Sequence, residues 1–192
     1  MLIDQSELRR GETLSARELP RMLAFAAAVA DGVVHVKTAS GASLRSDDPA
    51  FETQLQSQLG HPISLHEDQS GDNHDDADVL VITLPSVRAL SAEYGAPRNA
   101  LRFRPNIILD GEIAPFAELA WPGKRFRAGS VELEAAKPDT RCIMTTIDPD
   151  TLEIDPHFLR FIVEKHAQLF GVYCRVVTPG TVREGDEWKQ IA

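Results

Sequence analysis

Residues 79–95, VLVITLPSVRALSAEYG, decide the fold, because a strand and a helix follow one another within them. The first five residues form a short run rich in Val and Ile, which is typical of a strand. The pattern then changes: Val87 and Leu90 fall on one helical face, and Pro85 stands in the first turn, where its missing N–H costs nothing. Gly95 ends the helix. The sequence thus predicts a strand followed by a helix over 85–94.

The same two patterns recur along the chain, with strands in the majority. Further helices are predicted at 49–59, where Phe51, Leu55 and Leu59 share a face, and at 156–169. Helix and strand do not alternate regularly, which argues against a doubly wound parallel sheet. The predicted fold is therefore α+β and sheet-dominated, a twisted barrel with peripheral helices. The predicted strands are 33–37, 63–66, 79–83, 107–110, 130–135, 142–147 and 172–177.

Net charge and the length of the apolar runs argue against several classes of partner. The chain has 192 residues, with 20 basic against 29 acidic side chains and a net charge of −9. This balance argues against a nucleic-acid partner or an anionic membrane surface. The N-terminus has no apolar signal core, and the longest apolar run, 22–30, is about half of what a transmembrane helix needs. We expect a cytoplasmic protein without a membrane partner.

The segment RFRPN (102–106) is the first candidate site, and it lies in a stretch where basic residues outnumber acidic ones. Pro105 disfavours a helical conformation at Arg104, so the segment is predicted to be extended. Alternation along a strand then places Arg102, Arg104 and Asn106 on one face. Two guanidinium groups and an amide suit a phosphate joined to a hydrogen-bonding heterocycle. The alternative is an edge strand with a merely solvated polar face.

The two cysteines are predicted to differ. Cys174 alternates with apolar residues and reads as a core residue. Cys142 stands between a loop with two cations and a predicted strand, and a cation such as Arg141 beside a thiol favours its thiolate form, a ligand for soft metal centres. A purely structural cysteine is the alternative.

The six histidines show no spacing of metal ligands. The acidic segment 66–78 resembles a calcium loop only loosely, so it is predicted to be an exposed loop.

Several motifs, taken together in this order, resemble one family, the MOSC domain (molybdenum cofactor sulfurase C-terminal domain). The branch is the one that resembles the mitochondrial amidoxime reducing component and its bacterial counterparts. The resemblance covers nearly the whole chain, and the first two motifs are specific when they occur together. The motifs are RFRPNIILDG (102–111), DTRCIMTTIDPDT (139–151), FGVYCRVVTPGTVREGD (170–186), VLVITLPSVRAL (79–90) and a segment within 2–22.

The resemblance implies a single MOSC-like domain over 1–192, with a shortened N-terminal portion, 1–78, and the core motifs in 79–192. It also implies a molybdenum cofactor (molybdopterin), with Cys142 as the catalytic residue and the ligand of molybdenum. Relatives carry a Lys-Ser pair in an earlier strand, and nothing like it precedes Leu2, which predicts a weakly retained cofactor. The other residues implied to hold the cofactor are Arg104, Asn106, Thr140 and Arg141.

The activity implied by the resemblance is that of an oxidoreductase reducing N-hydroxylated or N-oxygenated small molecules, with electrons from separate electron-transfer proteins. Two other functions stay open. One is a carrier or binding module for the cofactor or for sulfur held as a persulfide on Cys142. The other is an interaction protein with a vestigial site, since fold does not fix function.

Overall fold

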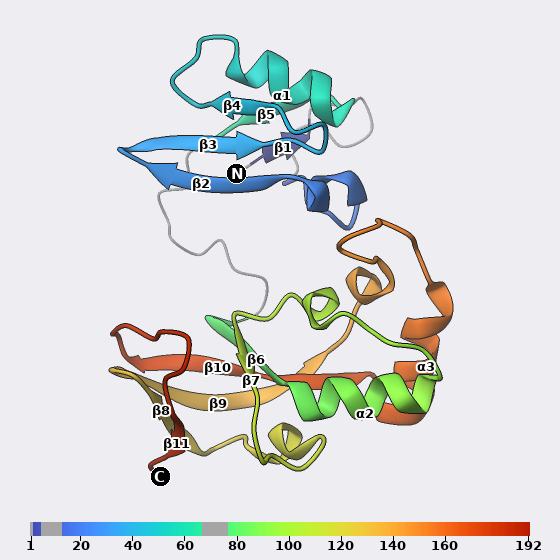
Figure 1. The fold of residues 1–192 in the computed structure, drawn as a ribbon, viewed down its shortest axis with the longest axis vertical. Coiled ribbons are helices and arrows are strands. Elements are labelled where there is room, and N and C mark those ends of the chain that lie inside the picture. Colours follow the sequence, from blue (N-terminus) through green and yellow to red (C-terminus); the bar gives the residue numbers. More distant parts are fainter. Residues whose placement is uncertain (1, 5–12, 67–76) are drawn as a thin grey trace. The chain divides into compact units, whose positions relative to one another are not determined.

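The computed structural model describes residues 2–4, 13–66 and 77–192, and it divides the chain into two compact units (Figure 1). The first unit comprises residues 1–73 with 149–153, and the second comprises 74–148 with 154–192. Most of the predicted acidic loop, residues 67–76, lies outside the described residues.

The first unit contains two small antiparallel sheets and one α-helix. Its three-stranded sheet has the order β2-β3-β4, and β1 pairs with β5 in the other sheet. The bounds are β1 (Leu2–Asp4), the 3-10 helix η1 (Pro20–Ala24), β2 (Ala26–Ala30), β3 (Val33–Lys37), β4 (Ser43–Arg45), α1 (Phe51–Leu59) and β5 (Ile63–Leu65).

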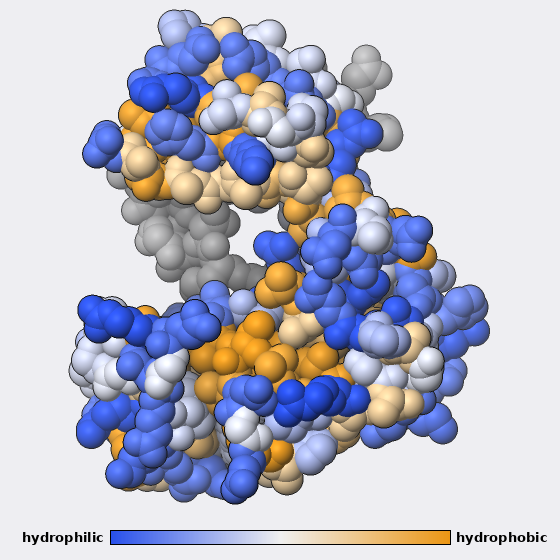
Figure 2. All heavy atoms as spheres, in the orientation of Figure 1, coloured by the Kyte–Doolittle hydropathy of each residue, from blue (hydrophilic) through white to orange (hydrophobic). Residues whose placement is uncertain are grey.

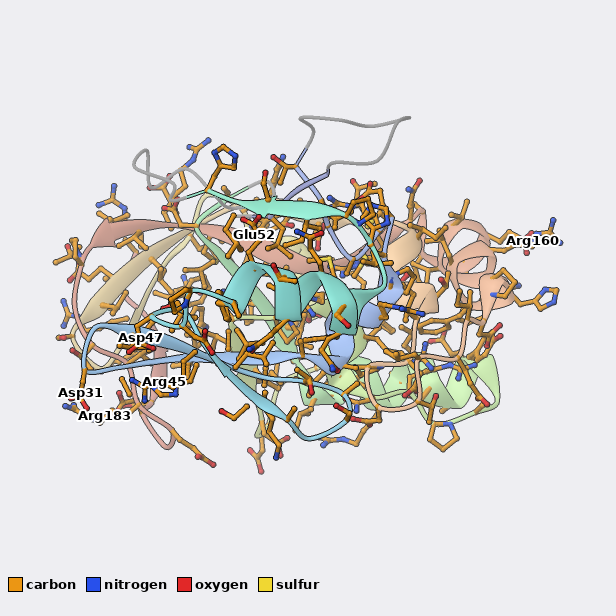
Figure 3. All side chains as sticks on the ribbon, turned by 90° about the horizontal axis from the view of Figure 1, so that it is seen from above. Asp31, Arg45, Asp47, Glu52, Arg160 and Arg183 are labelled. Atoms are coloured by element: carbon orange, nitrogen blue, oxygen red, sulfur yellow. The ribbon has the colours of Figure 1, made fainter. Side chains whose placement is uncertain are left out.

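A tight hairpin joins β2 to β3. Asp31 and Gly32 both have positive φ, 52° and 75°, as a two-residue hairpin turn of this hand requires. Strand β2 lies within the apolar run 22–30 and is not among the predicted strands. The Asp-Gly pair is the local signal that marks it, because this pair between two apolar runs favours a hairpin. On β4, Arg45 makes a two-pronged ion pair with Asp47, at 2.9 Å from Nε and 2.7 Å from Nη2 (Figure 3).

The apolar face of α1 forms the core of the first unit. Phe51, Leu55 and Leu59 are all buried, which confirms the predicted periodicity. Gly60 ends the helix in the left-handed conformation. The core is completed by Leu14, Val36, Leu44 and Ile63.

The second unit is built on a curled six-stranded sheet of order β11-β8-β9-β10-β6-β7, in which only β6 and β7 are parallel (Figure 1). The helices α2 and α3 pack against β6 and β10 respectively. The bounds of the strands and α-helices are β6 (Val79–Thr83), α2 (Leu84–Tyr94), β7 (Ile107–Leu109), β8 (Arg125–Ala128), β9 (Val131–Thr140), α3 (Pro156–His166), β10 (Leu169–Thr178) and β11 (Trp188–Gln190). Three 3-10 helices complete the unit: η2 (Ala100–Phe103), η3 (Ala117–Ala120) and η4 (Ile143–Thr146).

The long antiparallel pair β9–β10 curls because its register shifts at three places. At the first shift stands Gly171, with φ of 81°. A Cβ atom there would lie 2.8 Å from Ile82 Cγ2 and 3.0 Å from the Val81 carbonyl oxygen. Glycine is therefore required both for the backbone conformation and for the close approach of β10 to β6.

Two apolar clusters pack in the second unit. One joins the sheet to α2, through Val87 and Leu90, and to α3, through Phe158. In the same cluster, Phe103 and Phe170 are fully buried and stack with ring centroids 4.0 Å apart. The other contains Phe126, which stacks on Trp188 at 4.9 Å. Figure 2 shows apolar side chains at the surface where β6 and β7 lie, and Ile108 of β7 is 40% exposed.

The sheet-dominated α+β prediction is confirmed, with three local differences. The strand predicted at 142–147 is wrong, because η4 occupies most of it. The helix predicted over 156–169 ends at His166, and Leu169 already belongs to β10. Strands β1, β2, β4, β8 and β11 were not predicted. Within the described ranges, no helix has the length and apolar character needed to span a membrane.

Candidate cofactor site

The RFRPN segment is a turn and not an extended strand, so the prediction of its conformation is wrong. Residues up to Phe103 form η2, whose first turn is capped by the Asn99 side chain. Arg104 follows with φ of 55° and ψ of 43°, and its N–H donates to the Leu101 carbonyl at 3.0 Å. This left-handed residue reverses the chain between η2 and β7, which the rule for residues before proline does not anticipate.

As a result, the three polar side chains of the segment do not share one face. Arg102 is buried, with 5% exposure, whereas Arg104 is exposed. Within the described part of the chain, the Arg104 guanidinium has no hydrogen bond or ion pair, and it is free to bind an anion. Asn106 ties β7 to β6: its Oδ1 accepts from the Leu80 N–H at 2.8 Å, and its own N–H donates to the Leu80 carbonyl at 2.9 Å.

The second predicted element, Cys142, stands at the start of a compact turn. Cys142 is half-buried and precedes η4. The Thr145 hydroxyl donates back to the Cys142 carbonyl at 2.9 Å, and the Thr146 hydroxyl donates to the Ile143 carbonyl at 2.7 Å. Such local bonds from threonine compete with the ladder of a strand, which explains why this apolar-looking segment forms a 3-10 turn.

Thr140 and Arg141, the two residues before the cysteine, differ in exposure: the first is exposed and the second is buried. Thr140 is exposed at the end of β9. Arg141 is 5% exposed; its guanidinium binds the buried carboxylate of Asp139 and donates to the Phe103 carbonyl at 2.8 Å. The guanidinium carbon also lies 5.3 Å from the centroid of the Phe103 ring. Its charge is thus directed to Asp139, whereas the sequence suggested only that it lies beside the thiol.

The two predicted motifs are joined through their arginines. Arg102 donates from Nη1 to the carbonyls of Thr145 and Thr146 at 3.3 and 3.1 Å, and from Nη2 to Asp148 at 2.6 Å. Arg141 reaches the other way, to the Phe103 carbonyl. Each motif therefore satisfies backbone carbonyls of the other, and η2 packs against η4. Arg102 was predicted to share the anion-binding face with Arg104, and this is wrong, because Arg102 faces inward to protein carbonyls and Asp148.

A second buried polar group lies at the start of α2, and the sequence did not indicate it. Glu118 is fully buried, and its Oε2 accepts from the hydroxyls of Ser86 and Thr83 at 2.8 and 3.4 Å. Burial raises the pKa of this carboxyl, and the hydrogen bonds oppose the shift only in part. Its Oε1 has no hydrogen-bond partner among the described residues. Through Thr83 and Ser86, this carboxyl supports the start of α2.

The two motifs together offer donor groups of the kinds that suit an anionic cofactor with a soft metal. They comprise a half-buried thiol, a free guanidinium and the Asn106 amide nitrogen, which has no hydrogen bond in the described residues. In the same ranges, no group of three or more His, Cys, Asp or Glu side chains is arranged to hold a metal ion.

Comparison with known proteins bears on the same residues. The model of the MOSC domain family matches residues 68–189. This chain belongs to the MOSC domain family. Both motifs and the Cys142 turn lie inside the matched range.

Two curated relatives are much longer than the part of them that the MOSC chain matches. It is 32% identical over 120 residues to the mitochondrial amidoxime-reducing component 1 of Mus musculus, covering 56% of this chain and 34% of the relative. It is 32% identical over 130 residues to the molybdenum cofactor sulfurase of Drosophila erecta, covering 67% of this chain and 16% of that protein. The chain therefore spans about a third or less of the length of these relatives.

Among solved structures, YiiM from Geobacillus stearothermophilus matches with a TM-score of 0.49 and 20% identity, over 61% of this chain and 55% of that chain.

Proposed function

We propose that this MOSC protein binds the molybdenum cofactor and reduces N-hydroxylated or N-oxygenated small molecules, with Cys142 as the protein ligand of molybdenum. One observation carries the proposal: the half-buried Cys142 thiol stands on a turn bound to the RFRPN segment, whose Arg104 guanidinium is free. The name of one relative, a molybdenum cofactor sulfurase, supports the cofactor, and the name of another, an amidoxime-reducing component, supports the reduction of an N-hydroxylated substrate.

Each residue has a defined part in the proposal. Arg104 offers a planar fork of N–H donors to the cofactor phosphate, and Asn106 offers its free amide to the pterin. Thr140, two residues before the thiol in sequence, offers an exposed hydroxyl. Arg141 holds the Phe103 carbonyl, next to Arg104, while its charge is balanced by Asp139.

The reaction takes two electrons and two protons for each N-hydroxylated substrate. The N–O bond breaks, the nitrogen gains a hydrogen, and the oxygen leaves as water. When bound, the cofactor would supply the two-electron redox chemistry. A separate electron-transfer protein would supply the electrons, since none of the residues named here is an electron source.

Metal and pterin analysis of protein purified without oxygen tests the proposal. Wild type and Cys174→Ala should retain molybdenum and pterin in equal amounts, whereas Cys142→Ala should lose most of both. Cys174 is the matched control because it is fully buried in the second unit. Equal molybdenum content in the two cysteine variants, or none in wild type, would contradict the proposal.

The second candidate function is a carrier of sulfur on Cys142, which the similarity to a molybdenum cofactor sulfurase favours. A turnover assay distinguishes the two functions. With a reduced viologen dye as electron source and an aryl hydroxylamine as substrate, the reductase should form the amine. A carrier should instead accept one sulfur atom on Cys142 from a persulfide donor and form no amine.

A further inference from the structure

We propose that Arg102 is a positioning residue, which fixes the Cys142 turn against the segment that carries Arg104. The inference rests on the proposed function, since it assigns the support of the same thiol. Arg102 itself is not placed in contact with cofactor or substrate.

The contacts of Arg102 explain why it suits this role. It is 5% exposed and makes three hydrogen bonds. Two reach the carbonyls of Thr145 and Thr146 at the end of η4, and the third reaches Asp148 just beyond it. The last carbonyls of a short helix lack partners within the helix, so a buried turn of this kind needs donors from outside. Thr146 has a second donor, the Asp155 N–H at 2.8 Å, but no other described donor reaches the Thr145 carbonyl.

A short path of hydrogen bonds connects Arg102 with the cysteine. Arg102 fixes the Thr145 carbonyl, and the Thr145 hydroxyl donates to the Cys142 carbonyl at 2.9 Å. Thr145 is fully buried, so neither bond is exchanged for water without local opening. Removal of the guanidinium would therefore release the turn on which the thiol stands.

The charge of Arg102 also needs its partner. Asp148 accepts at 2.6 Å, and its side chain is 22% exposed. A guanidinium can donate to this carboxylate and to the two carbonyls at once, whereas an ammonium group offers no such planar fork. The geometry therefore favours arginine over lysine at this position.

The reactivity of the Cys142 thiol provides the test, with the aromatic disulfide DTNB as the probe. The full chain is produced in a host that cannot synthesise the cofactor, so that the thiol is not covered. Cys174 serves as an internal control, because it is fully buried and burial raises its pKa to about 12. Faster labelling of Cys142 alone, relative to wild type, reports local opening of the turn, whereas labelling of both thiols reports unfolding.

We expect Cys142 to be labelled at least about tenfold faster in Arg102→Ala than in wild type, because the variant loses three hydrogen bonds from a charged group and the loss of one such bond already corresponds to about tenfold. Cys174 should stay unlabelled, and Arg102→Lys should give an intermediate rate. Arg127→Ala is the matched control, since Arg127 makes an exposed ion pair with Glu132 at 2.5 Å and should leave the rate unchanged. An unchanged rate in folded Arg102→Ala would overturn the inference.

If Arg102→Ala does not fold, Thr145→Val takes its place, because it removes the hydroxyl that donates to the Cys142 carbonyl at 2.9 Å and leaves only the longer bond from the Thr145 N–H, at 3.2 Å. Faster labelling of Cys142 alone supports the path from Arg102, and an unchanged rate in this variant overturns it. The proposed function is decided separately. If wild type contains no molybdenum, the proposed function is wrong, but the labelling result stays valid. If wild type contains molybdenum and the labelling rate of Arg102→Ala is unchanged, only the role of Arg102 is wrong.

Discussion

Arg102 and Arg141 hold each other's segments: Arg102 donates to the Thr146 carbonyl at 3.1 Å, and Arg141 donates to the Phe103 carbonyl at 2.8 Å. The partners are separated by 44 and 38 positions in the chain. Both guanidinium groups are buried, and each is balanced by a carboxylate, Asp148 or Asp139. The two motifs are therefore one structural unit, in which each supplies donors that the other's backbone needs.

The free guanidinium of Arg104 leads to a first prediction about cofactor binding. Arg104→Ala should weaken the affinity for the cofactor by about 1.5–3 kcal/mol for each charge-assisted bond lost, about 10- to 150-fold. Arg104→Lys should recover only part, because lysine lacks the fork. Equilibrium binding of the isolated cofactor measures this. Arg160→Ala, another exposed arginine of the same unit (Figure 3), should bind as wild type. Equal affinity in all variants would contradict the role of Arg104.

The two thiols should react in a fixed order. In native, cofactor-free protein, a thiol reagent should modify Cys142 alone, because Cys174 is fully buried and its pKa is raised to about 12 by burial. In denaturant, both should react. Counting modified thiols by intact mass measures this directly, and modification of Cys174 in the native protein would show that the β10 core is not closed as described.

Glu118 should make the stability of the second unit depend on pH. Its pKa is raised above the ordinary value of 4.5, chiefly by burial, so the folded protein holds this proton more tightly than the unfolded chain. The free energy of unfolding should therefore fall as the pH rises from about 4.5 through the raised pKa, since the unfolded chain ionises first. Glu118→Gln should remove this slope, whatever its effect on absolute stability.

Denaturant titrations at a series of pH values measure the effect of Glu118. Both tryptophans, Trp121 and Trp188, lie in the second unit, so their fluorescence follows its unfolding. Other titrating groups are common to the two proteins and cancel in the difference. Parallel curves for wild type and Glu118→Gln would show that the carboxyl ionises alike in both states.

Gly171 should not tolerate a side chain. Gly171→Ala should destabilise the second unit by about 2–4 kcal/mol, from the positive φ together with overpacking against β6. Gly185→Ala separates the two causes: Gly185 has φ of 90° but no neighbour within 4 Å of an added Cβ, so its cost should be only about 1–2 kcal/mol. The same tryptophan fluorescence measures both, and equal losses would exclude the steric contribution.

Local sequence pattern was enough for those elements whose own residues specify them. Strand β6 and helix α2 follow from a Val- and Ile-rich run, Pro85 and Gly95, and the buried face of α1 follows from three apolar residues spaced by four. Strands β8 and β11 were not predicted because they are short: β8 buries only Phe126 and Ala128, and β11 has no fully buried residue, so neither gives a long apolar pattern.

The candidate site divides in the same way. The sequence by itself determined which residue types are present and in what order: a thiol after an arginine, and an arginine and an asparagine around a proline. Only the tertiary structure decided that Arg102 turns inward while Arg104 stays exposed, and that Thr145 and Thr146 form a turn in place of a strand. The reason is physical: the direction of these side chains depends on carbonyls about forty positions away, whose unpaired acceptors no local pattern reveals.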